Sequence, residues 1–387
     1  MHIAIIAEYN PFHEGHAYQL KEVRRHFGEN CTVSIILGGI FSQRGEPYVA
    51  PPYVRAHAAL LGGADLVVEM PFPFSASPAS VFARAGVEIA EKIGADVLAF
   101  GSECGSLDTL YSILERLDGD ELRTALEQKS KEGDAVGKTR VFADIFKELY
   151  GSENRLDMPN DILGIEYLRA IKALGAKIKP FTILRKGDYK SGEGEFTSAS
   201  SLRKAYKNGG MPEIRGGMPK EVFDVFLDAE KNGLFAPDIE KLAGAALLKL
   251  NEEHFCDIAF SGSGIIGRLK SAAKGAKTIS ELLRSAATKR YTDAELSRAL
   301  LYTLFSVKRN DLDEEVRYTK VLALNARGRE ILAKNLKIEL VTKPSDLSKL
   351  SEGAKEQYSR TFTAERAYAL CLSGCYEAMS QSPKVIK

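Results

Sequence analysis

The amino-terminal segment constrains the fold of this chain more than any other feature. Residues 3–7 form an apolar run typical of a buried strand, and residues 8–16 follow it and end in the tetrapeptide His-Glu-Gly-His. An amphipathic helical pattern begins there, with Ala17, Leu20 and Val23 at helical spacing. Ligands of open α/β sheets bind where the carboxyl end of a strand is followed by a helix, so we expect a parallel sheet with its ligand site at residues 13–16.

The two histidines at this junction predict a phosphate-binding site. A helix N-terminus presents unpaired N–H groups and the positive end of the helix dipole, and both favour phosphate. The imidazoles of His13 and His16 can donate to oxygens that gain charge at a reacting phosphorus, and we expect Gly15 to leave room for a nucleotide against the backbone. A coincidental pair, or half of a metal site, is the alternative. A metal site needs further ligands, and the other histidines occur singly, at His2, His26, His57 and His254.

The composition of the whole chain is typical of an ordinary globular protein. Its 387 residues suffice for two or three domains, and 44% of them are hydrophobic and 27% charged. We find no apolar run long enough to cross a bilayer and no signal-peptide pattern, so we expect a cytoplasmic protein without a membrane partner. The odd number of cysteines, without zinc-type spacing, predicts reduced thiols at Cys31, Cys104, Cys256, Cys371 and Cys375.

Strand and helix patterns alternate through the first half of the chain. We predict strands at residues 32–37, 65–70, 97–100 and 179–184 and helices at 53–61 and 80–93. A mostly helical stretch follows from 107 to 150, and Pro159 suits the first turn of another helix. This alternation predicts right-handed βαβ units in a parallel sheet covered on both faces, with ligand-binding loops at residues 38–47 and 101–103.

Helical periodicity dominates the second half. Residues 197–203 begin a helix with several hydroxyl side chains, which can cap the helix or can hold the outer phosphates of a triphosphate. Residues 209–212 mark a boundary, with 216–219 as the alternative. Beyond it we predict helices at 221–232, 238–250, 280–288, 293–307 and 364–378. We therefore expect an α/β domain over residues 1–210 and a mainly helical domain over residues 211–387.

A basic segment lies within the expected helical domain. Between residues 268 and 290 a single acid, Glu281, stands against seven basic residues, and Lys308 and Arg309 follow. The seven are Arg268, Lys270, Lys274, Lys277, Arg284, Lys289 and Arg290. Such clustering predicts a surface for an RNA phosphate backbone, although solvated helix faces also carry this pattern. The net charge of +1 does not decide between the two interpretations.

Several blocks, in order along nearly the full chain, resemble the bacterial tRNA(Met) cytidine acetate ligase family of the nucleotidyltransferase superfamily. The blocks are residues 8–16, 43–47, 100–103, 159–167, 288–292 and 321–325. The resemblance implies a Rossmann-like nucleotidyltransferase sheet domain followed by a helical tRNA-binding domain. It also implies a ligase reaction in which acetate and ATP, with Mg2+, give acetyl-adenylate and pyrophosphate. The acetyl group then passes to the exocyclic amine of the wobble cytidine in elongator tRNA(Met), which becomes acetylcytidine.

The resemblance also implies roles for individual residues. The implied ATP-binding set is Ile6, Ala7, Glu8, Tyr9, Asn10, Pro11, Phe12, His13, Glu14, Gly15, His16, Ala17, Tyr18, Gln19, Gly101, Asn160 and Arg185. Within it, His13 and His16 would be catalytic and would donate to the α-phosphate region while acetate attacks. Mg2+ would screen the triphosphate and help pyrophosphate to leave. Lys289 and Arg290 would belong to the surface that docks the tRNA.

Two departures from the family pattern and two competing functions accompany the resemblance. Asp161 stands where an asparagine is common, and residues 260–264 replace a segment that usually carries an acid. A small-molecule adenylyltransferase would share the histidine motif but would not need a helical half of this size with a basic segment. A non-catalytic RNA-binding protein would not need the intact His13, Gly15 and His16.

Overall fold

The computed structural model describes residues 1–131, 138–151, 158–186, 196–251, 257–260, 264–377 and 381–386, without the side chains of 129–131 and 138–143. His254, Cys256 and residues 261–263 of the segment that departs from the family pattern lie outside these ranges. The cysteines within them are free thiols, as expected. Among the described helices, none combines the length and the apolar character needed to cross a bilayer.

Five parallel strands form the centre of the first half, in the order β5-β4-β1-β2-β3. Their bounds are β1 His2–Ala7, β2 Thr32–Gly38, β3 Leu66–Met70, β4 Val97–Ser102 and β5 Lys179–Leu184. Ala7 pairs with Leu37 and Gly38 pairs with Met70, so the carboxyl ends of β1, β2 and β3 reach one edge of the sheet. The five predicted strands and their parallel arrangement are confirmed. The strand order reverses between β1 and β4, which is the switch point where ligands of such sheets bind.

The second half of the chain adds three strands to this sheet, which the sequence patterns do not predict. β6, Tyr318–Leu324, pairs antiparallel with β3, whereas β7, Glu339–Val341, and β8, Lys384–Val385, pair parallel with β6. Every residue of β6 is buried, so its sequence lacks the alternation that identifies a half-exposed strand. Residues beyond 211 are therefore mainly but not only helical, and the division of the chain at residue 210 stays a prediction.

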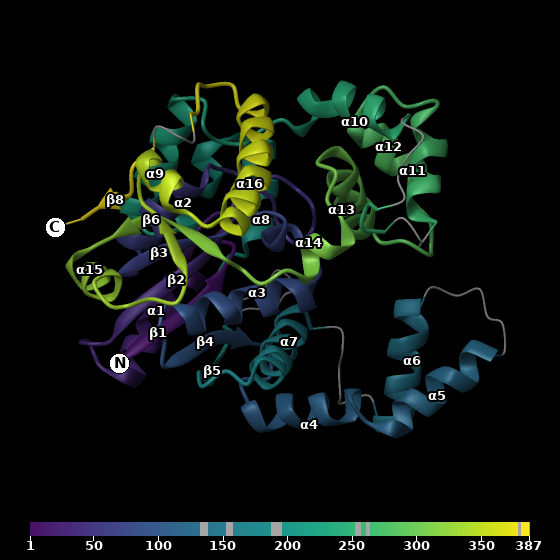
Figure 1. Cartoon of the computed structure of the whole chain (residues 1–387), viewed down its shortest axis with the longest axis horizontal. Helices are drawn as coiled ribbons and strands as arrows, with labels where there is room; N and C mark the ends of the chain where they lie inside the picture. Colours follow the sequence, from purple (N-terminus) through teal and green to yellow (C-terminus); the bar gives the residue numbers. More distant parts are fainter. Residues whose placement is uncertain are drawn as a thin grey trace.

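Helices cover both faces of the sheet and bury two separate cores (Figure 1). One face carries α1 Glu14–Phe27, α2 Pro52–Leu61 and α9 Lys220–Lys231, and the other carries α3 Ala79–Lys92, α4 Leu107–Leu117 and α7 Pro159–Leu174. Successive residues of β1 supply the two cores alternately: Ile3 and Ile5 belong to the first, Ala4 and Ile6 to the second. Each fully buried isoleucine stabilises the fold by about 1.5–3 kcal/mol.

The remaining helices lie around this centre. They are α5 Asp120–Lys131, α6 Lys138–Tyr150, α8 Ala199–Gly209, α10 Ala243–Leu250, α11 Ile265–Ala273, α12 Ile279–Ala286, α13 Asp293–Leu304, α14 Arg309–Asp313, α15 Ala326–Leu332 and α16 Glu352–Cys371. In Figure 1, α10, α11, α12 and α13 form a group beside the sheet. We call them the helical group. They share a third core that includes Leu250, Leu269, Leu282 and Leu296.

The helices predicted for the second half agree only in part with those observed. α9, α10, α12 and α13 confirm four of them, with small shifts of their ends. The prediction for residues 364–378 was wrong in its bounds, because α16 begins at Glu352, where Ser351 caps it, and ends at Cys371. α11, α14 and α15 were not predicted.

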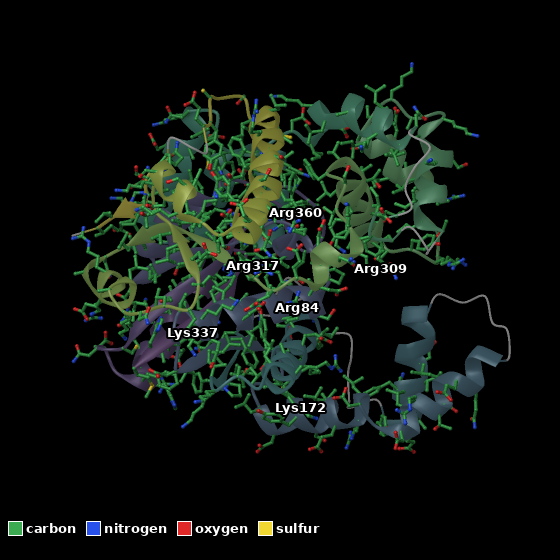
Figure 2. All side chains as sticks on the ribbon, in the orientation of Figure 1. Arg84, Lys172, Arg309, Arg317, Lys337 and Arg360 are labelled. Carbon is green, nitrogen blue, oxygen red and sulfur yellow. The ribbon has the colours of Figure 1, made fainter. Side chains whose placement is uncertain are left out.

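Two arginines join the helical group to the sheet through α14. Arg84 of α3 donates to the carbonyl oxygens of Leu312 at 2.6 Å and Glu314 at 3.0 Å. Arg360 of α16 pairs with Asp311 at 3.1 Å and also with Glu314. Figure 2 shows both arginines close to α14, near the middle of the molecule. Their charges are therefore engaged in holding α14 between α3 and α16.

A buried charge cluster joins β6 to β3 and α16. Lys320 of β6 lies 3.2 Å from a carboxylate oxygen of Glu69 of β3 and also pairs with Glu365 of α16, and all three side chains are almost fully buried. Burial raises the pKa of Glu69 to about 7. A buried ion pair is strongly disturbed when one partner is removed, because the other charge is left without compensation. The second half of the chain is thus tied to the central sheet by charge as well as by strand pairing.

Candidate active site

His13 and His16 form the start of α1 itself. His13 is the N-cap residue, and its Nδ1 accepts the backbone N–H of Gly15 at 3.0 Å. Nδ1 of His16 accepts the backbone N–H of His13 at 3.2 Å. The two imidazoles thus satisfy two of the N–H groups at the helix entry, in the manner of a capping box. Their ring centroids lie 3.8 Å apart, so the backbone holds the two rings side by side.

These hydrogen bonds determine the protonation state of both rings. Because Nδ1 is the acceptor in each ring, we assign the neutral tautomer with its hydrogen on Nε2. Burial, together with the positive charge of Arg185, lowers the pKa of His13 to about 3. Burial, His13 and Arg185 hold the pKa of His16 well below its ordinary value. At neutral pH each imidazole is therefore an uncharged N–H donor whose other nitrogen is already engaged.

Gly15 makes room for a histidine ring. A Cβ atom on Gly15 would lie 2.8 Å from Cε1 of His13, closer than such atoms can approach, and 3.0 Å from Nδ1 of the same ring. We expected the missing side chain to leave space for a nucleotide against the backbone. The structure instead assigns that space to the His13 ring, which folds over the first turn of α1 to reach the N–H of Gly15.

Aromatic side chains of the turn before α1 restrict His16. Tyr9 has a φ of 43°, in the left-handed region that residues other than glycine seldom adopt. Its ring centroid lies 4.6 Å from that of His16, and the ring of Phe12 lies 5.5 Å from it. The side chain of Asn10 accepts the backbone N–H of Val49 at 2.8 Å, which anchors the turn. The orientation of His16 is thus fixed by packing as well as by its Nδ1 bond.

A buried arginine joins the loops that follow β1 and β2. Arg55 of α2 is fully buried, and its guanidinium lies 4.0 Å from the centroid of the Tyr48 ring. It donates to four backbone carbonyl oxygens, those of Glu8 (2.7 Å), Gly38 (2.7 Å), Ala50 (2.9 Å) and Gly39. The Glu8 carboxylate accepts the Tyr48 hydroxyl at 3.1 Å and the backbone N–H of Gln43 at 2.9 Å. One side chain thus sets the position of both loops at the edge of the sheet.

The other three predicted ATP contacts meet at the ends of β4 and β5. Arg185 donates to the side-chain oxygen of Asn160 at 3.4 Å. A Cβ atom on Gly101 would lie 3.1 Å from Cγ of Arg185, so the glycine lets the arginine stem cross β4. The amide of Asn160 donates to Glu103 at 2.6 Å. Two strands and the N-terminus of α7 therefore bring Gly101, Asn160 and Arg185 together, as the resemblance implies.

Asp161 preserves the contacts of the loop in which it departs from the family pattern. Its Oδ1 accepts the backbone N–H groups of Glu103 at 2.8 Å and Cys104 at 3.1 Å. In return, the Glu103 carboxylate accepts the backbone N–H of Asp161 at 2.8 Å. The oxygen of an asparagine amide could accept the same two bonds. The aspartate therefore holds the loop after β4 against the start of α7.

The Ser-rich helix start predicted at 197–203 is the beginning of α8. Ser198 is its N-cap, and its hydroxyl accepts the backbone N–H of Ser201 at 3.1 Å. Arg203, one turn later, donates to the backbone oxygen of Asn10 at 2.8 Å. This bond places the start of α8 against the turn before α1, so two helix N-termini face the same edge of the sheet.

These elements enclose a cavity of about 320 Å3 at the switch point, which we call the main cavity. The predicted ATP-binding residues that line it are Ile6, Ala7, Glu8, Tyr9, Asn10, His13, His16, Gln19, Gly101, Asn160 and Arg185. Gly15 and Tyr18 line a smaller cavity that shares His13, His16 and Arg185 with the main one. The other predicted positions lie away from it: Phe12 and Ala17 are buried in the core, Glu14 is on the first turn of α1, and Pro11 lines a neighbouring cavity.

Several residues of the main cavity were not predicted as site residues. They are Ser42, Gln43, Arg44, Glu46, Ala79, Phe82, Phe100, Pro159, Leu163, Tyr167, Ser198, Ala199, Ser200 and Arg203. Two of the segments that carry them were predicted from the sequence: the ligand-binding loop at 38–47 and the helix start with hydroxyl side chains at 197–203. Ala79 and Phe82 gave no signal, because they belong to a helix whose pattern indicates only that one side is buried.

A second cavity, of about 580 Å3, lies between the helical group on one side and the loop after β2 and α8 on the other. Its walls are largely apolar and include Tyr206 of α8, Phe235, and Leu300 of α13. It shares Glu46 and Arg203 with the main cavity. The two cavities are therefore neighbours, and these two side chains lie between them.

Lys289 and Arg290 are exposed in the turn between α12 and α13 and line neither cavity. The guanidinium of Arg290 lies 5.3 Å from the centroid of the Tyr291 ring. Arg268 of the same basic segment differs, because it donates to the backbone oxygens of Ser285 and Ala286 at 3.2 Å each. Arg268 therefore holds the end of α12, whereas Lys289 and Arg290 present their charges to solvent.

Comparisons with known proteins agree with this arrangement. Residues 1–382 match the model of the HIGH Nucleotidyl Transferase family. The tRNA(Met) cytidine acetate ligase of Acetivibrio thermocellus is 32% identical, over 95% of this chain and 94% of that protein. The protein of the same name from Syntrophotalea carbinolica is 34% identical, over 92% of this chain and 87% of that protein. The crystal structure of Thermotoga maritima TmcAL bound with alpha-thio ATP has a TM-score of 0.88 and 25% identity, covering 99% of both chains.

Proposed function

This chain belongs to the tRNA(Met) cytidine acetate ligase family of HIGH nucleotidyl transferases, and we propose that it is an ATP-dependent ligase that acetylates the wobble cytidine of elongator tRNA(Met). Within the site, the observation that supports this proposal best is the pair of neutral imidazoles at the start of α1. They stand at the switch point of the sheet, in a cavity that two helix N-termini border. This arrangement suits a nucleoside triphosphate with its α-phosphate against His13 and His16.

The first step activates acetate. A carboxylate oxygen of acetate attacks the α-phosphorus of ATP, the bond from that phosphorus to the bridging oxygen of pyrophosphate breaks, and acetyl-adenylate forms. Negative charge grows on the oxygens around the phosphorus, and Nε2–H of each imidazole is a preorganised donor for it. One such donor is worth about 10²–10³ in rate when its position is fixed beforehand. Because both rings are neutral in the resting site, their donors need no change of protonation before reaction.

The outer phosphates would lie toward α8 and the two arginines of the main cavity. The start of α8 offers unpaired N–H groups and the hydroxyl groups of Ser198 and Ser200. Arg203 stands one turn further on, and Arg185 approaches from the end of β5. These groups would hold pyrophosphate while its bond to the α-phosphorus breaks, and in doing so they would also align that bond with the attacking acetate.

Magnesium would reach this site with the triphosphate. No group of three or more His, Cys, Asp or Glu side chains suited to a metal occurs in the parts of the chain that the structure describes. The Glu8 carboxylate is engaged by Gln43 and Tyr48. Mg2+ is commonly held by substrate phosphates and water with few protein ligands, so MgATP rather than a protein-bound ion is the form that these residues fit.

The second step transfers the acetyl group to RNA. The amine of cytosine is a weak nucleophile, and the mixed anhydride of acetyl-adenylate compensates for that weakness. An anticodon-loop base can leave its stack at modest cost and enter a protein cavity. The exposed Lys289 and Arg290 would dock the tRNA backbone beside the helical group. Since tRNA and ATP are its substrates, we place the enzyme in the cytoplasm.

The test is incorporation of labelled acetate into tRNA(Met) by the purified protein in the presence of ATP and magnesium. Acetylcytidine at the wobble position of the elongator tRNA is the expected product. Adenylyl transfer to a phosphorylated small molecule without RNA labelling would favour an adenylyltransferase, and tRNA binding without any turnover would favour a non-catalytic RNA-binding protein. His16→Ala should lower acetate-dependent exchange of pyrophosphate into ATP by about 10²–10³, since it removes one fixed donor.

A further inference from the structure

We propose that Glu46 binds the exocyclic amine of the incoming cytidine and accepts its proton during acetyl transfer. The proposal rests on the function proposed above and adds to it a residue for the second step. Four observations carry it: the place of Glu46 between two cavities, the rigidity of its loop, the state of its carboxylate, and the proton balance of the reaction.

Glu46 lies where a nucleotide could meet the activated acetate. It lines the main cavity together with His13 and His16, and it also lines the second cavity beside the helical group. A base that reaches the adenylate from the second cavity must therefore pass this side chain. The phosphates of ATP would lie toward α8, whereas Glu46 follows the end of β2.

The loop that carries Glu46 is held firmly. Its backbone forms a tight turn, in which the N–H of Ser42 donates to the oxygen of Glu46 at 2.8 Å and the N–H of Gly45 donates to the oxygen of Ser42 at 2.8 Å. Gly45 has a φ of 75°, and a Cβ atom there would lie 2.6 Å from the backbone nitrogen of Arg298 on α13. Arg298 in turn donates to the backbone oxygen of Gln43 at 2.7 Å. A loop that packs directly on a helix in this way can place a side chain accurately.

The carboxylate of Glu46 is an available acceptor. Within the described ranges, it makes no hydrogen bond or ion pair and is exposed to the cavity. The alternatives around it are more constrained. Oε1 of Glu8 receives two hydrogen bonds, and the Nδ1 atoms of His13 and His16 accept backbone N–H groups. Among the described side chains that line the main cavity, Glu46 thus has the carboxylate that no hydrogen bond holds in place.

The chemistry of the second step calls for such a group. The amine nitrogen of cytosine attacks the carbonyl carbon of acetyl-adenylate, a C–N bond forms, and the C–O bond to the phosphate breaks with AMP as the leaving group. The nitrogen loses one proton, which passes to the Glu46 carboxylate and then to solvent. A glutamate is also the acceptor that proteins use to recognise the N4 amine of cytosine. A single carboxylate can therefore orient the amine and take its proton.

The experiment separates the two half-reactions in Glu46→Gln. Acetate activation is measured by pyrophosphate exchange and by trapping acetyl-adenylate with hydroxylamine, a nucleophile that needs no help from the tRNA site. Acetyl transfer is measured in a single turnover with tRNA(Met). We expect both activation readouts within about 2-fold of the wild type and transfer slowed by about 10²-fold or more, as for loss of a general base. Glu330→Gln, at an exposed acid on α15, should leave all three unchanged.

Other outcomes would overturn the proposal and are distinct from failure of the proposed function. Transfer by Glu46→Gln within a few-fold of the wild type removes the residue from the step. Parallel loss of exchange and transfer, recovered by added magnesium, would make Glu46 a ligand of the metal. If the wild type itself forms hydroxamate but acetylates no tRNA, the proposed function fails, whatever the variant does. Glu46→Asp, which restores a base one methylene further away, should recover part of the transfer rate but not alter exchange.

Discussion

Gly15→Ala tests whether the capping hydrogen bond of His13 is what positions its ring for the proposed contact with the phosphate. The added Cβ would lie 2.8 Å from Cε1 and 3.0 Å from Nδ1 of His13. The His13 ring cannot retreat toward His16, because the two ring centroids are already 3.8 Å apart. The ring must therefore rotate away from the N–H of Gly15, and its Nε2 must leave the place from which, in the proposed function, it donates to the α-phosphate.

The substitution is expected to change the free energy of unfolding little and to lower the rate of acetate activation strongly. Loss of the cap costs about 1 kcal/mol, and alanine in place of a helical glycine returns about 0.5–1 kcal/mol, so these two terms nearly cancel. Strain that the rotation does not relieve adds about 1–3 kcal/mol at most. One fixed donor is worth about 10²–10³ in rate. The variant should therefore remain folded and lose acetate activation by about that factor.

A matched control is available in α10. Gly244 is the second residue of α10, as Gly15 is of α1, but a Cβ atom there would meet nothing within 4 Å. Thermal unfolding and acetate-dependent pyrophosphate exchange would be measured on both alanine variants. Gly244→Ala should keep full exchange. Exchange near the wild-type rate in folded Gly15→Ala would refute the view that the glycine exists to admit the His13 ring.

Three further predictions follow from charges in the structure. Because burial lowers the pKa values of His13 and His16, the unfolded chain binds more protons than the folded chain below about pH 6.5. The free energy of unfolding, measured by denaturant titration, should therefore fall from pH 7 toward pH 4 by up to about 1.4 kcal/mol per pH unit and per histidine. The decrease should be smaller in a His13→Gln variant. Lys320→Met should lower the free energy of unfolding at neutral pH by about 3–5 kcal/mol, since it leaves the buried carboxylates of Glu69 and Glu365 without a partner. A smaller decrease would mean that the structure around these carboxylates relaxes. Replacing Lys289 and Arg290 with alanine should make tRNA binding less sensitive to salt. The slope of log Kobs against the logarithm of the salt concentration should decrease by about 1 for each phosphate that the protein no longer neutralises, and acetate activation should stay intact. An unchanged slope would mean that the RNA binds elsewhere.

The part of the candidate site that could be predicted from the sequence alone consists of residues that are also close together along the chain. Residues 6–16 form one strand, one turn and one helix start, so their proximity needs no tertiary information. Asn160 and Arg185 were implied by the family resemblance, and the structure brings them to this edge at the start of α7 and the end of β5. The contact between Gly15 and the His13 ring could not be predicted, since no pattern of residue types reveals that a side chain two positions earlier folds back over the glycine.

The unpredicted parts depend on contacts between distant segments. Arg55 looks like a surface residue of an amphipathic helix, yet it is fully buried because four carbonyl oxygens, from the end of β2 and the segments that follow β1 and β2, surround its guanidinium. β6 was missed although it is buried on both faces like β3, because its buried Thr319 and Lys320 are polar and interrupt the apolar run that marks such a strand. Glu46 was not singled out within the loop at 38–47, because its place between two cavities depends on the packing of α13 on that loop.

β6 also predicts that the nucleotide-binding half does not fold alone. A fragment of residues 1–210 would expose the edge of β3, and it would leave the buried Glu69 without Lys320. The loop after β2 would lose its support from Arg298, on which the position of Glu46 depends. Such a fragment should lack a cooperative thermal transition and should not bind MgATP, whereas coexpression with residues 211–387 should restore both. Cooperative unfolding of the fragment alone would show that the division at residue 210 is a folding boundary. In the structure the two halves share one sheet, because β6 pairs with β3.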